Sequence, residues 1–171
     1  MLVRPAAAQD ISAIQSIYAY HVLNGLASFE EEPPPLEEMR RRYEDVVGCG
    51  LPYLAAEDSG EVVGYGYCTL YRTRSAYRYS LEDSVYVKNG LQGKGIGRTL
   101  LAELIARCEA LNYRQIIAVI GDSANAASIA VHASQGFVRA GNLRSTGYKF
   151  GRWVDSVLMQ RPLGEGDGSK P

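Results

Sequence analysis

The hydrophobic and polar positions in the first half of the chain predict two helices and three strands. Apolar residues from Ile11 to Val22 recur every three or four positions, as on one face of a helix, and Gly25 can end that helix. Acidic residues and prolines at 30–35 then interrupt the helical pattern. Two later apolar runs, joined at 58–60 by Asp-Ser-Gly, have the pattern of a β-hairpin. The predicted order is a strand at 1–4, a helix through 11–22, a charged helix at 36–47 and strands at 51–57 and 61–70.

The second half alternates strands and helices around a glycine-rich segment. Leucine and isoleucine residues that share one face predict a long helix directly after this segment. An uninterrupted apolar run at 115–120 is typical of a strand that is covered on both faces. The expected elements are a strand at 84–88, the long helix, a strand at 115–120, a helix that starts at Ser123 or Asn125 and ends by Gly136, and strands at 137–140 and 148–161.

Together these elements predict one α/β domain, with a mixed central β-sheet flanked by helices on both faces. A chain of 171 residues is long enough for one such domain and its hydrophobic core. We expect residues 1–161 to form the domain. The polar tail at 162–171, with its glycines and serine, is expected to be disordered.

Composition and charge narrow the possible classes of function. The net charge of −1 gives no electrostatic reason to expect nucleic acid or a membrane surface as a partner, and no apolar run is long enough to span a bilayer. The 3 cysteines lack C-x-x-C spacing, which argues against a disulfide framework or a zinc site and is typical of a cytoplasmic protein. The chain has 12 tyrosines against 3 phenylalanines, so we expect several tyrosines to line a polar cavity or to occupy half-exposed strand positions.

The segment from Gln92 to Arg98 combines glycines with positive charge between a strand and a helix. Glycine lets the backbone adopt left-handed angles and approach a ligand, and the free N–H groups of a first helical turn attract an anion. The spacing from Gly93 is G-x-G-x-G, which matches neither the G-x-G-x-x-G of dinucleotide-binding folds nor the G-x-x-x-x-G-K-[ST] of P-loops. NAD and nucleoside triphosphates are therefore poor candidates. A glycine turn that only packs the helix on the strand is the alternative to an anion site.

The glycine-rich segment resembles the acyl-CoA loop Q/R-x-x-G-x-G/A of the GNAT superfamily of N-acetyltransferases, with Gln92, Gly95 and Gly97 at its fixed positions. The strand and helix that follow are also similar, since the superfamily starts that helix with N-x-x-S, here Asn125 and Ser128. The resemblance covers residues 1–161 and implies the GNAT fold, acetyl-CoA as co-substrate and no metal. The residues that it implies for coenzyme binding are Val85, Tyr86, Val87, Gln92, Gly93, Lys94, Gly95, Ile96, Gly97, Arg98, Asn125 and Ser128.

Several stretches resemble a narrower group of the superfamily, the phosphinothricin and methionine sulfone/sulfoximine N-acetyltransferases. They are residues 80–87, residues 118–120, the helix that contains His132, and residues 147–155. Members of this group acetylate the α-amino group of small amino-acid analogues and are generally homodimers. The resemblance therefore implies a small amino-acid-like substrate and a homodimer for this chain.

Acetyl transfer from a thioester to an amine needs a neutral amine, a stabilised oxyanion and a leaving thiolate. Glu82 is expected just before the strand that leads into the glycine loop, and we predict that it is the general base, with a water relay. Asp83 should point to the opposite face. His132 stands where many superfamily members have a tyrosine that protonates the thiolate, and it is predicted to protonate sulfur, to orient the amine or to be structural. A β-bulge at Val85 or Val87 would free a backbone N–H for the thioester carbonyl.

A substrate carboxylate needs a cation, and the segment ahead of Glu82 is basic. Arginine offers bidentate pairing, and the resemblance assigns substrate contact to this segment, with Arg72 best aligned. Phe29 and Tyr77 are expected to wall the pocket for the substrate side chain. The residues predicted to bind substrate are Phe29, Arg72, Thr73, Arg74, Tyr77 and Glu82, and a solvated basic loop is the alternative.

Two other functions stay open. Within the superfamily, the acceptor can be a polyamine, an aminoglycoside or a peptide N-terminus, although such cationic acceptors favour an acidic site and this segment is basic. Outside enzymes, the chain can be a CoA-binding regulatory module. The presence of both Glu82 and His132 argues against that second reading.

Overall fold

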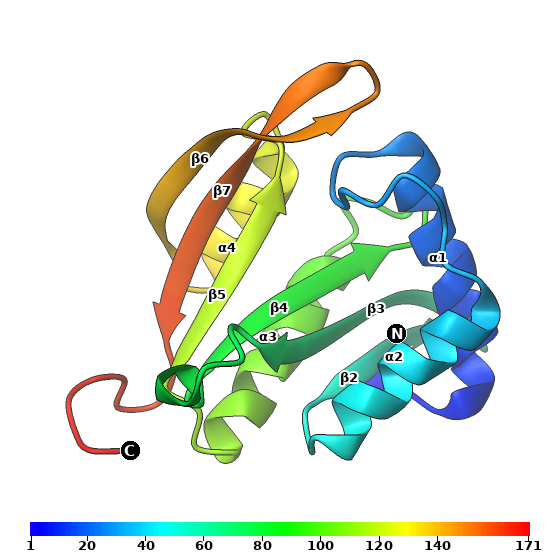
Figure 1. Ribbon diagram of the computed structural model, residues 1–171. Helices are drawn as coiled ribbons and strands as arrows, with labels where there is room; N and C mark the ends of the chain where they lie inside the picture. The colour runs from blue at the N-terminus through cyan, green and yellow to red at the C-terminus, as the bar shows by residue number, and fades with distance from the viewer.

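The computed structural model describes all residues from 1 to 171. Its seven-stranded mixed sheet carries helices on both faces (Figure 1), which confirms the predicted fold class. The strands are β1 (Leu2–Pro5), β2 (Tyr53–Asp58), β3 (Glu61–Leu70), β4 (Ser80–Val87), β5 (Gln115–Gly121), β6 (Val138–Lys149) and β7 (Arg152–Pro162). The helices are α1 (Ile11–Asn24), α2 (Leu36–Gly48), α3 (Ile96–Ala110) and α4 (Ala126–Ser134), with short 3₁₀ turns η1 (Ala8–Asp10) and η2 (Ser75–Tyr77).

The sheet consists of two parts that separate along β4 and β5. The strand order is β1-β2-β3-β4-β5-β7-β6, and only β4 and β5 run parallel to each other. These two strands pair only over residues 80–83 of β4 and 115–118 of β5. Beyond this stretch they diverge, and the outer half of β4 pairs with β3 alone (Figure 1). A V-shaped opening therefore lies in the middle of the sheet.

Helix α3 packs on the first part of the sheet at two glycines of β3. A Cβ at Gly64 would approach the side chain of Ile96 to 3.0 Å, and a Cβ at Gly66 would approach Leu104 to 3.0 Å. Side chains at these two positions would push the helix off the strand. The alternation of a strand then directs Tyr65, between the two glycines, to the other face.

That other face carries a layer of stacked tyrosines under α1 and α2. The rings of Tyr53 and Tyr67 stack with centroids 4.9 Å apart, those of Tyr65 and Tyr86 stack at 5.2 Å, and Tyr18 of α1 meets Tyr86 edge-on at 5.1 Å. Burial raises the pKa of Tyr65 and of Tyr86 well above the ordinary value. Cross-strand stacking places Tyr53 and Tyr65 in the core, so the expectation of a polar cavity or of half-exposed positions is wrong for these two. Tyr67 and Tyr86 are partly buried, and Tyr86 lines a cavity with polar residues, as expected.

The three cysteines differ in accessibility. Cys68 of β3 and Cys108 of α3 are fully buried and face each other with their Sγ atoms 3.6 Å apart. Cys49 follows the end of α2 and is exposed. All three are free thiols. The buried pair forms part of the contact between α3 and the sheet.

Two strands are longer than the sequence pattern indicates. Strand β4 begins at Ser80 rather than at residue 84, so Glu82 lies inside a strand, between Thr69 of β3 and Ile117 of β5. The sequence did not predict this half of the strand, because it contains the acidic pair Glu82 and Asp83 and acidic residues are depleted in strands. Strand β6 continues through 141–149, where glycines, polar residues and register shifts against β7 obscured it.

After β7 the chain makes a series of turns. Arg114 donates hydrogen bonds to the Ser169 hydroxyl at 3.1 Å and to the Lys170 carbonyl at 3.0 Å. The disorder expected at 162–171, and the domain boundary before it, stay predictions. No helix of the structure combines the length and the apolar character needed to cross a membrane.

Candidate active site

The glycine-rich loop ends at the amino terminus of α3. Gly93 and Gly95 have φ angles of 79° and 82°, a left-handed region that favours glycine, and Gly95 is the N-cap of the helix. The first hydrogen bond into the helix runs from the N–H of Thr99 to the carbonyl of Gly95, at 3.0 Å. The three N–H groups between these residues therefore have no partner within the helix. Together with the positive end of the helix dipole they form an anion site.

A cavity of about 330 Å³ opens against this helix start. The predicted coenzyme residues that line it are Val85, Val87, Gln92, Gly93, Gly95, Ile96, Gly97, Arg98 and Ser128. His132 lines it too, with Leu91, Ala127 and Val131, which were not anticipated. Lys94 is exposed and lies outside the lining. The side chain of Gln92 accepts a hydrogen bond from the Gly90 N–H at 2.9 Å and so stabilises the conformation of the loop. Free donors and an apolar wall fit a coenzyme with a pyrophosphate and a long arm.

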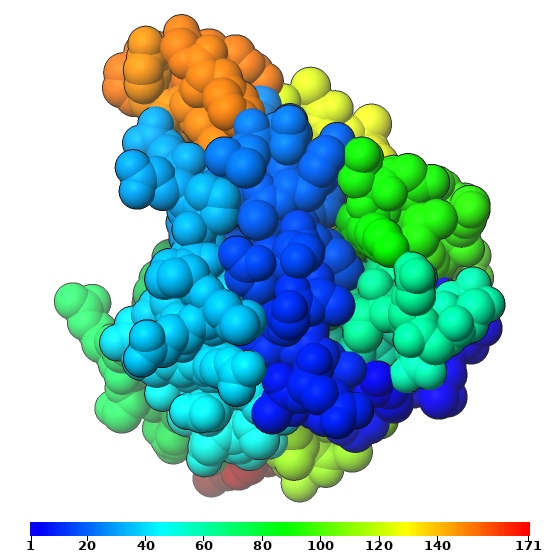
Figure 2. Space-filling model, turned by 90° about the vertical axis from the view of Figure 1, so that its right-hand side faces the viewer, coloured from blue at the N-terminus to red at the C-terminus, as the bar shows by residue number.

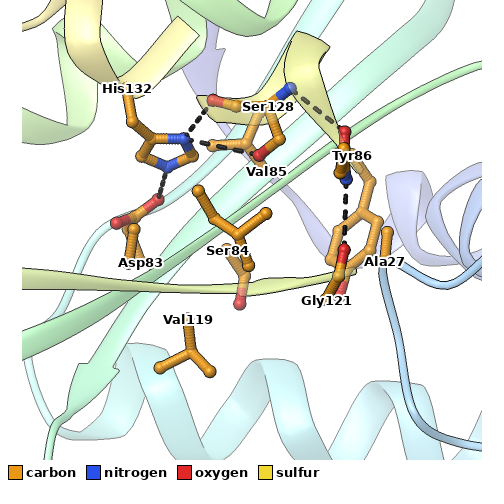
Figure 3. A pocket seen from close by; sticks show the side chains of 12 residues that line it. Ala27, Asp83, Ser84, Val85, Tyr86, Val119, Gly121, Ser128 and His132 are labelled. Carbon is orange, nitrogen blue, oxygen red and sulfur yellow. Dashed lines mark hydrogen bonds and ion pairs between the residues drawn. The ribbon is translucent and has the colours of Figure 1, made fainter. Parts of the chain in front are cut away.

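A smaller cavity, of about 50 Å³, lies in the V-shaped opening (Figure 3). Residues of β4, β5, α4 and the segment after α1 line it. Val85, Ser128 and His132 line both cavities, so the two form one path from the start of α3 to the middle of the sheet. The two remaining predicted coenzyme residues, Tyr86 and Asn125, line this smaller cavity. Asn125 also caps α4, because its Oδ1 accepts the Ser128 N–H at 3.1 Å.

The outer half of β4 presents backbone groups to the opening. The N–H of Lys88 donates to the Val63 carbonyl of β3 at 2.9 Å, and the alternation of an antiparallel pair then turns the N–H groups of Val85 and Val87 away from β3. Both lie beyond Asp83, the last residue of β4 that pairs with β5. The β3–β4 register is unbroken, so the expected β-bulge is absent. Separation of the two strands frees these N–H groups instead.

His132 of α4 spans the opening to β4 through Asp83. Its Nε2 lies 3.0 Å from Oδ2 of Asp83, and its Nδ1 lies 2.8 Å from the carbonyl oxygen of Ser128 (Figure 3). The side chains of His132 and Asp83 are only 7% and 1% exposed. The imidazole also packs edge-on against Phe137, with centroids 5.0 Å apart. These contacts fix α4 at the mouth of the opening.

Both ring nitrogens of His132 face acceptor oxygens, which fits an imidazolium that donates two hydrogen bonds. Burial lowers the pKa of His132, but the hydrogen bond and charge of Asp83, together with the Ser128 carbonyl, outweigh it, so the pKa is raised above its ordinary value. The second carboxylate oxygen of Asp83 is buried and has no hydrogen-bond partner. His132 is therefore the compensating group for this buried carboxylate.

Glu82 lies on the face of β4 opposite to Asp83, as strand alternation predicts, and shares that face with the tyrosine layer. Its side chain is 31% exposed. Burial is the largest influence on Glu82 and raises its pKa above the ordinary value, against the opposing effect of Arg72. A carboxylate with a raised pKa suits a general base that works near neutral pH.

Arg72 is the residue of the basic segment that the structure brings to Glu82. Its Nη1 lies 4.0 Å from Oε2 of Glu82, and its guanidinium stacks over the ring of Tyr71 at 4.1 Å. The Arg72 side chain remains 56% exposed, so it can still meet a ligand. Tyr77 packs edge-on against Tyr71 at 5.8 Å, whereas Thr73 and Arg74 are exposed in the turn between β3 and β4.

Phe29 follows α1 and packs against the second part of the sheet. A Cβ at Gly147 of β6 would come within 2.5 Å of its ring, and one at Gly121 of β5 within 3.1 Å. The ring is thus held between β5 and β6 and is 39% exposed. Figure 2 shows the orange β6–β7 hairpin directly above the light-blue segment that contains this residue.

Two features of the site were missed in the sequence. Asp83 was correctly assigned to the opposite face from Glu82, but its pairing with His132 depends on where α4 lies relative to the sheet. At Gly121 a Cβ would clash with the backbone carbonyl of Leu26, so the segment after α1 sits directly on the end of β5. A glycine at a strand end was the only signal of this close approach.

Comparison with known proteins identifies the family. The model of the acetyltransferase (GNAT) domain matches residues 3–158. A phosphinothricin N-acetyltransferase of Alcaligenes faecalis is 57% identical over 169 residues, which are 99% of this chain and 86% of that protein. An L-methionine sulfoximine/L-methionine sulfone acetyltransferase of Salmonella typhimurium is 38% identical over 165 residues, 96% of each protein. A crystal structure of a Sinorhizobium meliloti phosphinothricin acetyltransferase in complex with acetyl-CoA superposes with a TM-score of 0.97 at 48% identity, covering 99% of this chain and 92% of that one.

These similarities extend over almost the whole chain, and they include the glycine-rich loop and both walls of the opening. The predicted resemblance, the acetyltransferase activity and acetyl-CoA as the co-substrate are confirmed. The chain belongs to the GNAT family of acetyltransferases.

Proposed function

We propose that the chain acetylates the α-amino group of a small amino acid or analogue, of the phosphinothricin or methionine sulfoximine type. The observation that carries this proposal is the pairing of Glu82, a half-buried carboxylate with a raised pKa, with the partly exposed guanidinium of Arg72. A base for an amine and a cation for a carboxylate at one place suit an α-amino acid. The activities for which the two relatives are named support the same acceptor class.

Bound acetyl-CoA would supply the acetyl group as an activated thioester. Glu82 takes a proton from the acceptor ammonium, directly or through one water, and so produces the neutral amine that attacks in a direct transfer. Arg72 pairs with the carboxylate of the acceptor and orients its amino group toward the opening. Phe29 and Tyr77 wall the acceptor side chain, and Thr73 and Arg74 contribute the rest of the basic segment.

Groups on the other side of β4 handle the developing negative charge. The N–H of Val85, on the free edge of the strand, donates to the carbonyl oxygen as it becomes an oxyanion. The imidazolium of His132 lines the path at Val85 and stabilises the departing thiolate by its charge. Proton donation from His132 would break one of its two hydrogen bonds, so we assign it charge stabilisation rather than the role of an acid.

We further propose that the enzyme is a cytoplasmic homodimer. The β6–β7 hairpin projects from the body (Figure 2) and exposes Tyr148, Phe150 and Trp153 by 58%, 57% and 64%. Exposed aromatic residues of this kind are enriched in protein interfaces. A monomeric species in sedimentation equilibrium would contradict the dimer. The cytoplasmic assignment rests on the cysteine pattern alone.

A panel of acceptors tests the proposed substrate class. Thiol release from acetyl-CoA is measured with phosphinothricin, methionine sulfoximine, methionine sulfone and ordinary amino acids, each beside its decarboxylated amine where one exists. We expect the amino acids to exceed their amines in kcat/KM, because only they can pair with Arg72. A polyamine, aminoglycoside or N-terminal peptide that outranks them would replace the proposed acceptor. Thiol release with none of these acceptors would show that the acceptor belongs to another chemical class.

A further inference from the structure

One side chain of α1 reaches the free edge of β4. The Nε2 of His21 lies 2.8 Å from the carbonyl oxygen of Val87. Because a carbonyl can only accept, Nε2 carries a proton and His21 is the donor. Figure 2 shows α1 in blue beside the green segment that contains the end of β4 and the glycine-rich loop. The helix and the strand are thus joined at the point where β4 has lost β5 as a neighbour.

The hydrogen bond from His21 holds the peptide unit between Val87 and Lys88. The Val87 carbonyl and the Lys88 N–H belong to the same peptide plane, and the Lys88 N–H donates to Val63 of β3 at 2.9 Å. His21 takes the other end of that plane, so the last peptide of β4 is held from both sides. The Val87 carbonyl lies on the strand edge that also carries the free N–H groups of Val85 and Val87. Fixing the carbonyl therefore fixes the edge that faces the opening.

The imidazole is placed by aromatic contacts rather than by another polar side chain. Its centroid lies 5.5 Å from the ring of Tyr86 and 5.8 Å from that of Tyr20. Tyr86 is itself stacked on Tyr65 in the tyrosine layer. The ring of His21 lines neither cavity, whereas Val87 lines the larger one. Any effect of His21 on a ligand must therefore pass through the strand.

We infer that His21 is a positioning residue for the pantetheine arm of the coenzyme, because it holds the outer half of β4 so that its free N–H groups face the opening. The inference rests on the proposed function, since it requires the coenzyme arm to bind along this edge. The anion site at the start of α3 does not depend on His21. Loss of the His21 bond should consequently weaken binding of the arm and spare binding of the phosphates.

Calorimetric titration of two ligands separates these contributions. CoA carries the arm, and 3′-phosphoadenosine 5′-diphosphate is the fragment that ends at the pyrophosphate. His21→Leu replaces the imidazole with an apolar side chain and removes the donor, so we expect CoA to bind about 2- to 12-fold more weakly, the range for one neutral hydrogen bond, with the fragment unchanged. His21→Gln restores a donor and should bring CoA affinity back to within about 2-fold of wild type. Asn24→Ala, on the last turn of the same helix, is the matched control and should bind both ligands normally.

Steady-state kinetics give a second readout. In His21→Leu the KM for acetyl-CoA should rise, while the KM of the acceptor stays near its wild-type value. Equal weakening of both ligands would show that His21 only supports the fold, and unchanged CoA affinity in His21→Leu would also overturn the inference. Failure of the wild-type protein to bind CoA would instead refute the proposed function.

Discussion

Replacing Asp83 with asparagine removes one negative charge and almost no volume from the site. In the wild type, His132 donates from Nε2 to Asp83 at 3.0 Å and from Nδ1 to the Ser128 carbonyl at 2.8 Å. In Asp83→Asn the new amide can donate to Nε2, so a neutral His132 with its proton on Nδ1 satisfies both hydrogen bonds. The substitution therefore changes the charge state of His132 without opening a cavity.

The effect on the free energy of unfolding follows from the number of protons bound by the folded and the unfolded chain. Below the ordinary value of 6.5, His132 is protonated in both states and its pairing contributes fully to stability. As the pH rises through the raised folded pKa, that contribution is lost, because only the folded chain still holds the proton. Within this window the free energy of unfolding should fall with a slope that approaches about 1.4 kcal/mol per pH unit from this residue. Asp83→Asn should lose most of that slope.

Urea unfolding from about pH 6 to about pH 9 measures the slope directly. The matched control is Asp155→Asn, which removes a partly exposed carboxylate outside the opening. Hydrogen bonds from the Ser145 N–H and from Asn142 lower the pKa of Asp155, so it titrates below this range. The control should parallel the wild type, and Asp83→Asn should be flatter than both. If the Asp83→Asn curve instead runs parallel to the wild type, then His132 is neutral in the folded enzyme and the charge assigned to it is wrong. With the charge lost, kcat should also fall.

The remaining predictions concern the base, the coenzyme loop and the acceptor. Glu82→Gln should lower kcat by about 10²–10⁴-fold at pH 7 with both substrates still bound. The rate of this variant should rise with pH up to the pKa of the amine. The rate of the wild type should plateau at lower pH, because Glu82 loses its function as a base only when the pH falls through its raised pKa. An unchanged pH–rate profile in the variant would place the base elsewhere. Gly95→Asp puts a negative charge at the anion site, where φ is 82°, and should abolish CoA binding while circular dichroism shows a retained fold; normal binding would disprove the loop assignment. Arg72→Ala should lower kcat/KM for the acceptor by about 10- to 30-fold, since a charge-assisted pair is worth about 1.5–2 kcal/mol at a half-exposed side chain, and should leave the KM of acetyl-CoA unchanged. A decarboxylated acceptor that serves wild type equally well would refute the role of Arg72.

Much of the fold could be predicted because its signals are local. The apolar run at 115–120 forms β5, which continues for one residue more, and Asn125, one of the two expected starts of α4, is its N-cap. The glycine-rich loop could be recognised from its glycines, and Gly93 and Gly95 do adopt backbone angles that favour glycine. In each case the residues themselves determine the structure that they form.

The site could be predicted only in part, because its geometry depends on how distant segments meet. Glu82 and His132 were identified, yet the partner of His132 lies 49 positions away on β4 and depends on the placement of α4. A bulge was expected to free the N–H of Val85 or Val87, since nothing local shows that two paired strands will separate after Asp83. The inner half of β4 was missed because its stability comes from its neighbours on both sides rather than from β propensity.

The reaction rates of the buried thiols report how often α3 opens locally from the sheet. Cys68 pairs with Asp83 across β3 and β4, and it faces Cys108 at 3.6 Å beneath α3. Both residues are fully buried, so a thiol reagent can modify them only after α3 lifts away from the sheet. Cys49 is exposed and reacts without any such event, so it gives the reference rate within the same chain. The ratio of the Cys49 rate to the rate of the buried thiols therefore measures local opening of α3, the helix whose first turn forms the anion site.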